Sequence, residues 1–187
     1  MTVAAVVLAA GGGRRYGMPK ALVEYEGSLL VERAVGTAQA VCATVLVVLG
    51  ARAVDVWREA RLDDVIVLAN EDWETGMASS LRTGLRGLRA WPVRVDAAVL
   101  LLVDMPGMTP EVVARVAEHA SPDALAVATY DGVRAHPVLI GREHGAGVID
   151  TATGDEGARR YLAAHDVVEV DCTGLADPTD LDVPPAP

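Results

Sequence analysis

Val3-Ala4-Ala5-Val6-Val7-Leu8-Ala9, followed at once by Ala10-Gly11-Gly12-Gly13, is the stretch of sequence that indicates the fold class. Its first seven residues form a continuous apolar run rich in β-branched side chains, which is typical of a strand buried on both faces of a sheet. The glycines that follow predict a tight loop at the end of this strand. The rest of the chain repeats the pattern of short apolar runs separated by other segments.

Four more apolar runs follow, and segments with helical periodicity separate them. We predict strands at 44–49, 65–69, 97–103 and 124–128, and helices at 28–41, 54–60, 78–90 and 110–119. The helix at 110–119 has a clear start, because Thr109 can cap it and Pro110 and Glu111 suit its first turn. This alternation predicts an α/β three-layer sandwich around a mainly parallel, mixed sheet.

The second half of the chain is less regular. We expect an extra strand at 136–140 and a further helix at 156–164, and the tail at 176–187, rich in Asp and Pro, is expected to be extended. No internal repeat and no linker divides the sequence. We therefore predict one domain over residues 1–187.

Composition and charge exclude several classes of protein. The 187 residues are 51% hydrophobic and 22% charged, with a formal net charge of −10, which indicates a globular chain without affinity for nucleic acid or an anionic membrane. The N-terminus has neither a basic signal region nor an apolar run long enough for a membrane span, so we expect a cytoplasmic protein. Cys42 and Cys172 have no metal-ligand spacing, which favours buried free thiols.

Lys20 is the single lysine in a chain that has 16 basic residues. The abundance of Ala, Val, Arg and Gly suggests a coding bias that has replaced lysine by arginine. Arginine serves as well as lysine at most surface positions, but not where a compact, flexible point charge is needed. Composition alone therefore marks Lys20 as a functional residue.

The loop from Leu8 to Lys20 has the chemistry of an anion-binding loop. Consecutive glycines allow backbone N–H groups to converge on an anion, and Arg14, Arg15 and Lys20 add positive charge. Arg15 and Lys20 are suited to stabilise charge on the α-phosphate of a nucleoside triphosphate and on departing pyrophosphate. The structural alternative is a glycine-rich turn with solvated arginines.

Two other phosphate-binding motifs fit this loop poorly. A P-loop needs Gly-Lys followed by Ser or Thr, whereas Lys20 stands between proline and alanine. In a dinucleotide fingerprint that begins at Gly11 the third glycine would stand where the chain has Tyr16. The second predicted strand also ends at Gly50 without an acidic residue to hold a ribose.

Three downstream segments offer further candidate site residues. Asp104 ends the most apolar predicted strand, where open α/β sheets bind ligands, so it could hold Mg²⁺ against NTP phosphates or only cap the following turn. Ser79 and Ser80 could present hydroxyls and amides to a base edge, or could simply form a helix N-terminus. His136 could hydrogen-bond an acceptor, although an isolated histidine is more often structural.

The segment from Leu8 to Lys20 resembles the opening signature of the MobA/MocA-like nucleotidyltransferases, the family of the molybdenum cofactor guanylyl- and cytidylyltransferases. In that family L-A-A/G-G is followed by small residues, Arg, Met, Gly and Lys. Gly13 stands where the family usually has Ser, and Tyr16 stands where it usually has Met. Neither departure removes a charged group.

The resemblance continues along the chain. Residues 70–85 are similar to the family's N-x-x-W-x-x-G-x-x-x-S-L-x-x-G segment, which lies along the nucleotide. Asp104-Met105-Pro106 is similar to the family's metal-binding turn. Residues 136–138 and 154–159 are similar to segments on the acceptor side. Residues 180–184 resemble the D-I-D-T-P element, whose first acid commonly completes the metal site, although Val183 replaces Thr.

The resemblance implies a GT-A-like (nucleotide-diphospho-sugar transferase) Rossmann-like fold and a role for each matching residue. Arg15, Lys20 and Asp104 would be catalytic, Asp104 and Asp180 would bind Mg²⁺, and His136, Asp155 and Arg159 would contact the acceptor. The implied nucleotide-binding residues are Leu8, Ala9, Ala10, Gly11, Gly12, Gly13, Arg14, Asn70, Gly76, Ser79 and Ser80.

The function implied is transfer of a nucleotide from an NTP to a phosphorylated acceptor with release of pyrophosphate. Ala10 resembles the cytidylyltransferase branch, so CTP and a molybdopterin acceptor are favoured, and a molybdoenzyme partner would then receive the product. A guanylyl- or sugar-phosphate nucleotidyltransferase remains an alternative. So do a non-catalytic NTP-binding maturation factor for molybdoenzymes and a dinucleotide-binding reductase, which the motif comparison disfavours.

Overall fold

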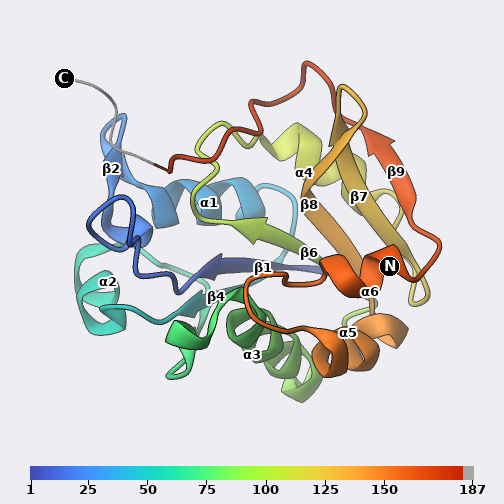
Figure 1. The fold of residues 1–187 in the computed structure, drawn as a ribbon, viewed down its shortest axis with the longest axis horizontal. Helices are drawn as coiled ribbons and strands as arrows, with labels where there is room; N and C mark the ends of the chain where they lie inside the picture. Colours follow the sequence, from blue (N-terminus) through green and yellow to red (C-terminus); the bar gives the residue numbers. More distant parts are fainter. Residues whose placement is uncertain (183–187) are drawn as a thin grey trace.

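The computed structural model describes residues 1–182, which form a mixed sheet between two layers of helices (Figure 1). The strands of this sheet are β1 (Val3–Ala9), β4 (Thr44–Leu49), β5 (Ile66–Ala69), β6 (Ala97–Leu102), β7 (Leu125–Tyr130), β8 (Val133–Gly141) and β9 (Val168–Asp171). The α-helices are α1 (Leu30–Gln39), α2 (Ala53–Glu59), α3 (Met77–Ala90), α4 (Pro110–Ala117), α5 (Gly145–Thr151) and α6 (Arg159–Ala163).

The sheet has seven strands in the order β5-β4-β1-β6-β8-β7-β9. β8 pairs antiparallel with both of its neighbours, and the other pairings are parallel, so the predicted mainly parallel, mixed sheet is confirmed. The continuous apolar runs follow from burial on both faces. In β1, for example, Val7 belongs to the core on one face and Val6 to the core on the other.

Helices cover both faces of the sheet, which confirms the three-layer arrangement. α1 and α4 pack on one face, and α3 and α5 pack on the other (Figure 1). α3 buries Leu81, Leu85 and Leu88 on one side of the helix, as its periodicity predicts. The hydroxyl of Thr109 accepts a hydrogen bond from the amide of Val112 at 3.4 Å, so the predicted N-cap of α4 is confirmed.

Several element boundaries differ from the sequence predictions. The helix predicted at 28–41 is shorter, because a small hairpin of β2 (Glu24–Tyr25) and β3 (Ser28–Leu29) precedes α1 and turns at Glu26 and Gly27, both with positive φ. The helix predicted at 156–164 begins only at Arg159, because Gly157 has a φ of +56°. α5 and β9 were not predicted.

The segment after β9 contains no helix or strand as far as residue 182, and it returns across the molecule to the end of β6 (Figure 1). Thr109 donates from its hydroxyl to the carbonyl of Leu175 at 3.1 Å, and the amide of Leu181 donates to the carbonyl of Asp104 at 2.8 Å. The predicted extended tail is therefore held at residues 175–182 by hydrogen bonds to the segment that follows β6. Its predicted continuation, including Val183 and Pro184, lies outside the described residues.

Cys42 and Cys172 are both buried and unpaired, as predicted. Burial raises the pKa of the Cys42 thiol to about 11. Among the described residues, no helix has the length and apolar character needed to cross a membrane.

The strand order creates a topological switch point between β1 and β6. From β1 the chain adds β4 and β5 on one side and then returns to place β6 on the other. In such sheets the loops after the two diverging strands leave a crevice at their carboxyl ends. Leu8 pairs in register with Leu102, so the glycine loop after β1 and the turn at Asp104 emerge at the same edge.

Candidate active site

Lys20 lies between two carboxylates at this switch point. It begins the 3₁₀ turn Lys20–Leu22, just after the glycine loop. Its Nζ donates to Asp104 Oδ2 at 2.7 Å and to Asp182 Oδ1 at 3.0 Å, and only 14% of its side chain is exposed. Arg15 Nη1 donates to the other carboxylate oxygen of Asp182 at 2.8 Å. Residues from three distant parts of the sequence thus form one charged cluster.

The electrostatics of this cluster keep Lys20 charged. Burial alone would lower the pKa of Lys20, but its hydrogen bonds to Asp104 and Asp182 outweigh this effect and raise the pKa. Lys20 in turn lowers the pKa of Asp182. Burial, followed by the nearby charge of Asp104, raises the pKa of Asp180. Two carboxylates therefore contact the ammonium group, and a third, that of Asp180, lies near enough to feel its charge.

Glycines shape the loop that precedes Lys20. Gly13 has a φ of +62°, and a Cβ at this position would collide with the carbonyl oxygen of Met18. The amide of Gly17 donates to the Gly13 carbonyl at 2.8 Å, which closes the turn. A Cβ on Gly12 would lie 2.8 Å from the ring of Trp73. The departure from Ser at Gly13 thus has a backbone reason.

The loop residues predicted to bind nucleotide differ in exposure. Leu8, Ala9 and Ala10 are buried, whereas Gly11 and Arg14 are exposed. The Ala10 carbonyl accepts a hydrogen bond from the amide of Ala51 at 2.9 Å. The exposed part of the loop therefore offers more surface to a ligand than the end of β1 does.

Asn70, Ser79 and Ser80 form a buried hydrogen-bond network. The Asn70 side-chain amide donates to the hydroxyl of Ser79 at 2.8 Å and to that of Ser80 at 3.0 Å, and all three residues are buried. Asn70 Oδ1 also accepts from the amide of Asp72 at 3.1 Å. Their side chains thus join the end of β5 to the start of α3. Contact of these residues with a base remains a prediction.

The loop at 154–157 lies against the start of α3. The amide of Met77 donates to Asp155 Oδ1 at 3.2 Å, and the amide of Ala78 donates to the carbonyl of Gly154 at 2.9 Å. Gly76 has a φ of +111°, and a Cβ there would lie 2.5 Å from the Gly154 carbonyl oxygen. Asp155, predicted to contact the acceptor, therefore also satisfies a free amide of α3.

A cavity of about 390 Å³ opens beside the Lys20 cluster. The structure brings together the three predicted acceptor residues here, since His136, Asp155 and Arg159 all line it, and Asp180 borders it as well. Most of the wall is apolar and includes Leu8 from β1, Leu100 and Leu102 from β6, and Val127 and Val138 from the neighbouring strands.

His136 is neutral in this cavity. Burial, opposed by Asp104 and assisted by Arg159, lowers the pKa of its imidazole to about 4. The backbone carbonyl of His136 accepts a hydrogen bond from the Tyr130 hydroxyl at 3.2 Å, which helps to fix this part of β8. A neutral imidazole can donate or accept a hydrogen bond, but it contributes no positive charge toward a phosphate.

Sequence reasoning missed two residues at this site. Asp182 contacts both Lys20 and Arg15, whereas the sequence singles out Asp180, two positions earlier. The acid pair in Asp-Leu-Asp was the available signal, and the resemblance to the D-I-D-T-P element favoured its first member. Arg134 also lines the cavity, where its guanidinium pairs with Glu169 at 2.7 Å.

Comparison with known proteins identifies several relatives. The family model described as the MobA-like NTP transferase domain matches residues 5–170. The nicotine blue oxidoreductase of Paenarthrobacter nicotinovorans is 34% identical over 96% of this chain and 92% of its own length. A probable molybdenum cofactor guanylyltransferase of a Geobacillus strain is 30% identical over 64% of this chain and 58% of its own.

Solved structures share the fold. Rv0371c from Mycobacterium tuberculosis is 27% identical and superposes with a TM-score of 0.84, covering 98% of this chain and 94% of that one. The same protein has also been crystallised in complex with manganese. The inositol-1-phosphate CTP transferase of T. maritima, 16% identical, covers 97% of this chain and 89% of its own with a TM-score of 0.71, which shows the GT-A-like fold. With its glycine loop, its Lys20 cluster and a family match over most of its length, the chain belongs to the MobA-like NTP transferase family.

Proposed function

We propose that this protein transfers a nucleotide from an NTP to a phosphorylated acceptor and releases pyrophosphate, with CTP and a molybdopterin-type acceptor as the favoured pair. The convergence of Lys20, Arg15, Asp104 and Asp182 beside the glycine loop carries this proposal. It places positive charge and carboxylates at the strand ends where α/β sheets bind nucleotides. The neighbouring cavity of about 390 Å³ supplies space for an acceptor.

In this reaction an oxygen of the acceptor phosphate attacks the α-phosphorus of the NTP. A new P–O bond forms, the bond to the β-phosphate oxygen breaks, and pyrophosphate leaves with its electron pair. The exposed amides of the glycine loop would bind the triphosphate, while Lys20 and Arg15 would stabilise the charge that develops on leaving. His136 and Arg159 would orient the acceptor, His136 as a neutral hydrogen-bonding group.

A divalent cation is proposed to bind at the charged cluster. Asp104 and Asp182 both reach the same ammonium group, so their carboxylates converge, and Asp180 lies close enough to Asp104 for its pKa to rise. Mg²⁺ is usually held by one or two carboxylates together with substrate phosphates. We propose that Asp104 holds Mg²⁺ with Asp182 or with Asp180, the partner that the sequence favours. The bound ion would neutralise phosphate charge.

Titration of Mn²⁺ followed by water-proton relaxation, with nucleotide present, distinguishes the two carboxylate pairs. We expect Asp104→Asn to abolish tight binding, and only one of Asp180→Asn and Asp182→Asn to weaken it about tenfold or more. Asp64→Asn is the matched control, because Asp64 is exposed and has a φ of +57° that asparagine tolerates. Unchanged affinity in Asp104→Asn would refute the proposed metal site.

Pyrophosphate release tests the reaction itself. The protein is incubated with each of the four NTPs, Mg²⁺ and molybdopterin, and pyrophosphate is measured with a coupled enzyme assay. We expect turnover with CTP in the parent protein, and a loss of about 10²–10³-fold in Lys20→Ala and in Asp104→Ala, with the fold retained by circular dichroism. Full activity of either variant would contradict the role assigned to that residue.

The choice of CTP is tested by calorimetric titration of the four NTPs. Ala10 supports CTP only through the resemblance, because Ala10 is buried and a Cβ on Gly50 would lie 2.8 Å from its methyl group. The methyl group of Ala10 therefore lies against Gly50. Preference for GTP or UTP would keep the reaction class and change the substrate. Binding without turnover would instead favour a non-catalytic maturation factor.

The similarity to nicotine blue oxidoreductase supports an oxidoreductase as a second candidate. We take as its form the dinucleotide-binding reductase, which the sequence motifs disfavour. The cavity beside the glycine loop has mostly apolar walls, which suits a planar heteroaromatic substrate. The residue after β4 argues against this candidate. A dinucleotide site needs an acidic side chain there to hold the ribose, but the chain has Gly50, and a Cβ at this position would meet Trp73 and Ala10. Titration with NADH and NADPH decides between the two: saturable binding favours the reductase.

A further inference from the structure

A second cavity, of about 290 Å³, lies at the opposite end of the sheet from the Lys20 cluster. It is formed where α3 ends, β6 begins, β8 ends and α5 begins. β6 starts here at Ala97 and reaches Leu102 shortly before Asp104. Six residues of extended strand span about 20 Å, so this cavity is separate from the candidate active site.

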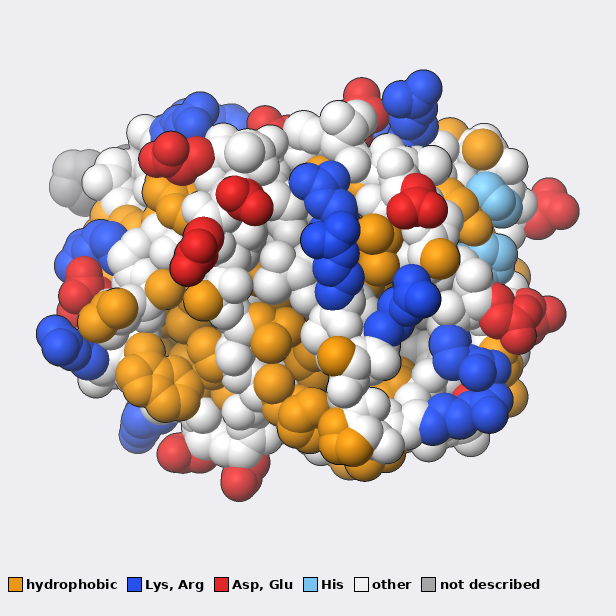
Figure 2. Space-filling model, turned by 90° about the horizontal axis from the view of Figure 1, so that it is seen from below, with side chains coloured by type: hydrophobic (Ala, Val, Ile, Leu, Met, Phe, Trp, Pro, Cys, Tyr) orange, Lys and Arg blue, Asp and Glu red, His pale blue; other side chains and the backbone are white. Residues whose placement is uncertain are grey.

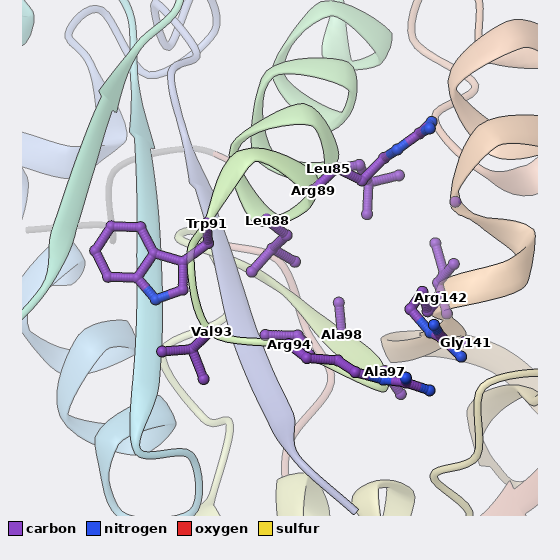
Figure 3. A pocket seen from close by; sticks show the side chains of 13 residues that line it. Leu85, Leu88, Arg89, Trp91, Val93, Arg94, Ala97, Ala98, Gly141 and Arg142 are labelled. Carbon is purple, nitrogen blue, oxygen red and sulfur yellow. The ribbon is translucent and has the colours of Figure 1, made fainter.

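Small residues line one side of this cavity, which we call the slot. Its floor includes Ala97 and Ala98 from β6 and Gly141 from β8, and Leu88 projects toward it from α3 (Figure 3). Gly145 at the start of α5 is buried, yet no neighbouring atom lies within 4 Å of the position that its Cβ would take. A buried glycine with open space beside it shows that the slot extends to α5.

Three arginines border the slot, in a protein whose net charge is −10. Arg94 and Arg142 lie at the same end, beside Ala97 and Gly141, and Arg89 is directed away from them (Figure 3). The pKa of Asp96 is lowered first by the hydrogen bond from the Thr2 amide and then by the charges of Arg94 and Arg142. Both guanidinium groups therefore lie near the same carboxylate.

The acids near these arginines offset their charge only in part. Arg94 Nε lies 3.4 Å from Asp96 Oδ1 and Arg142 Nη2 lies 3.8 Å from Glu143 Oε1, so both contacts are long. The Arg94 side chain is 69% exposed, and solvent weakens ion pairs of exposed arginines. Figure 2, which views the face carrying α3 and α5, shows hydrophobic side chains gathered over a broad area with basic groups beside it. The exposed Trp91 and Val93 extend the apolar border of the slot.

We propose that this slot binds a small organic anion that has a planar apolar body and one carboxylate or sulfonate group. The apolar body would lie over Ala97, Ala98 and Gly141, and the anionic group would accept hydrogen bonds from Arg94 and Arg142. Guanidinium groups at the mouth of an apolar cavity bind such anions well, because charge-assisted hydrogen bonds strengthen where water is displaced. The volume, at the small end of ligand sites, limits the body to about two fused rings.

Calorimetric titration with 2-naphthoate tests this inference, and the uncharged 2-naphthamide serves as the shape-matched comparison. We expect saturable one-to-one binding of the acid and at least about tenfold weaker binding of the amide. Gly145→Val should fill part of the slot, because a Cβ at this position meets no neighbouring atom within 4 Å. Its matched control is Gly36→Val in α1, another helical glycine with open space at its Cβ position. Arg94→Gln/Arg142→Gln should weaken binding about tenfold or more, whereas Arg58→Gln/Arg86→Gln, at exposed positions, should not.

Each outcome bears directly on the site. Loss of binding in Gly145→Val and in the Arg94/Arg142 double variant, with both controls unchanged, supports it. Unchanged affinity in Gly145→Val would place the probe in another cavity and overturn the inference. It would also be overturned if 2-naphthoate did not bind, or if acid and amide bound equally. Because the slot is remote from Lys20, these outcomes do not depend on the proposed reaction.

Discussion

Acidification should destabilise this protein through His136. The pKa of this imidazole is lowered from 6.5 to about 4, first by burial in the cavity beside the Lys20 cluster, with Arg159 adding to the effect and Asp104 opposing it. In the unfolded chain the same group takes up a proton near its ordinary pKa. As the pH falls from about 6.5 to about 4, the unfolded state binds a proton that the native state rejects. The stabilisation is thus complete above the unfolded pKa and is lost in this window.

The size of the effect follows from these two pKa values. At pH 7 the imidazole is mainly neutral in both states, so it contributes little to the pH dependence. At pH 5 it is protonated in the unfolded chain and neutral in the folded one. Linkage between pH 7 and pH 5 then gives a loss of about 2 kcal/mol in the free energy of unfolding. A loss of this size is a substantial part of the stability of a typical domain.

Urea unfolding at pH 7 and at pH 5, followed by circular dichroism, measures this loss. His136→Gln retains a hydrogen-bonding side chain but cannot take up the proton, so its stability should fall by about 2 kcal/mol less than that of the parent over the same interval. His119→Gln, at an exposed position, is the matched control and should follow the parent. Equal pH dependence of the parent and His136→Gln would refute the conclusion that a neutral imidazole occupies the cavity.

Three further substitutions test other parts of the structure. Gly13→Ala should destabilise the protein by about 1–3 kcal/mol in urea unfolding, because the positive φ and the Met18 carbonyl exclude a Cβ; unchanged stability would contradict the loop geometry. Asn70→Ala should cost about 1–3 kcal/mol, since the two buried serine hydroxyls lose a shared donor; a loss of nucleotide affinity with stability unchanged would instead show base contact. Lys20→Arg should remain folded yet turn over at least about 10²-fold more slowly in the pyrophosphate assay, because the larger planar guanidinium does not fit between two carboxylates. Activity equal to that of the parent would contradict the conclusion that this position requires lysine.

Much of the fold follows from local sequence. The continuous apolar runs identified β1, β4, β5, β6 and β7, because strands buried on both faces need apolar side chains at nearly every position. Helical periodicity and cap residues located α3 and α4 for the same local reason. β9 and α5 were missed because they are short and polar on one side, and only their packing against the completed sheet stabilises them.

The sequence also determined the charged loop, the single lysine and the acid at the end of β6, since each stands in a motif of neighbouring residues. Only the tertiary structure decided which acid of the tail reaches Lys20, because Asp182 acts across 162 positions of sequence. It also decided that Arg94 and Arg142 meet at one slot, through the start of β6 and the end of β8. Contacts of this kind depend on strand order and register, and those are set by packing of the whole sheet rather than by any local pattern.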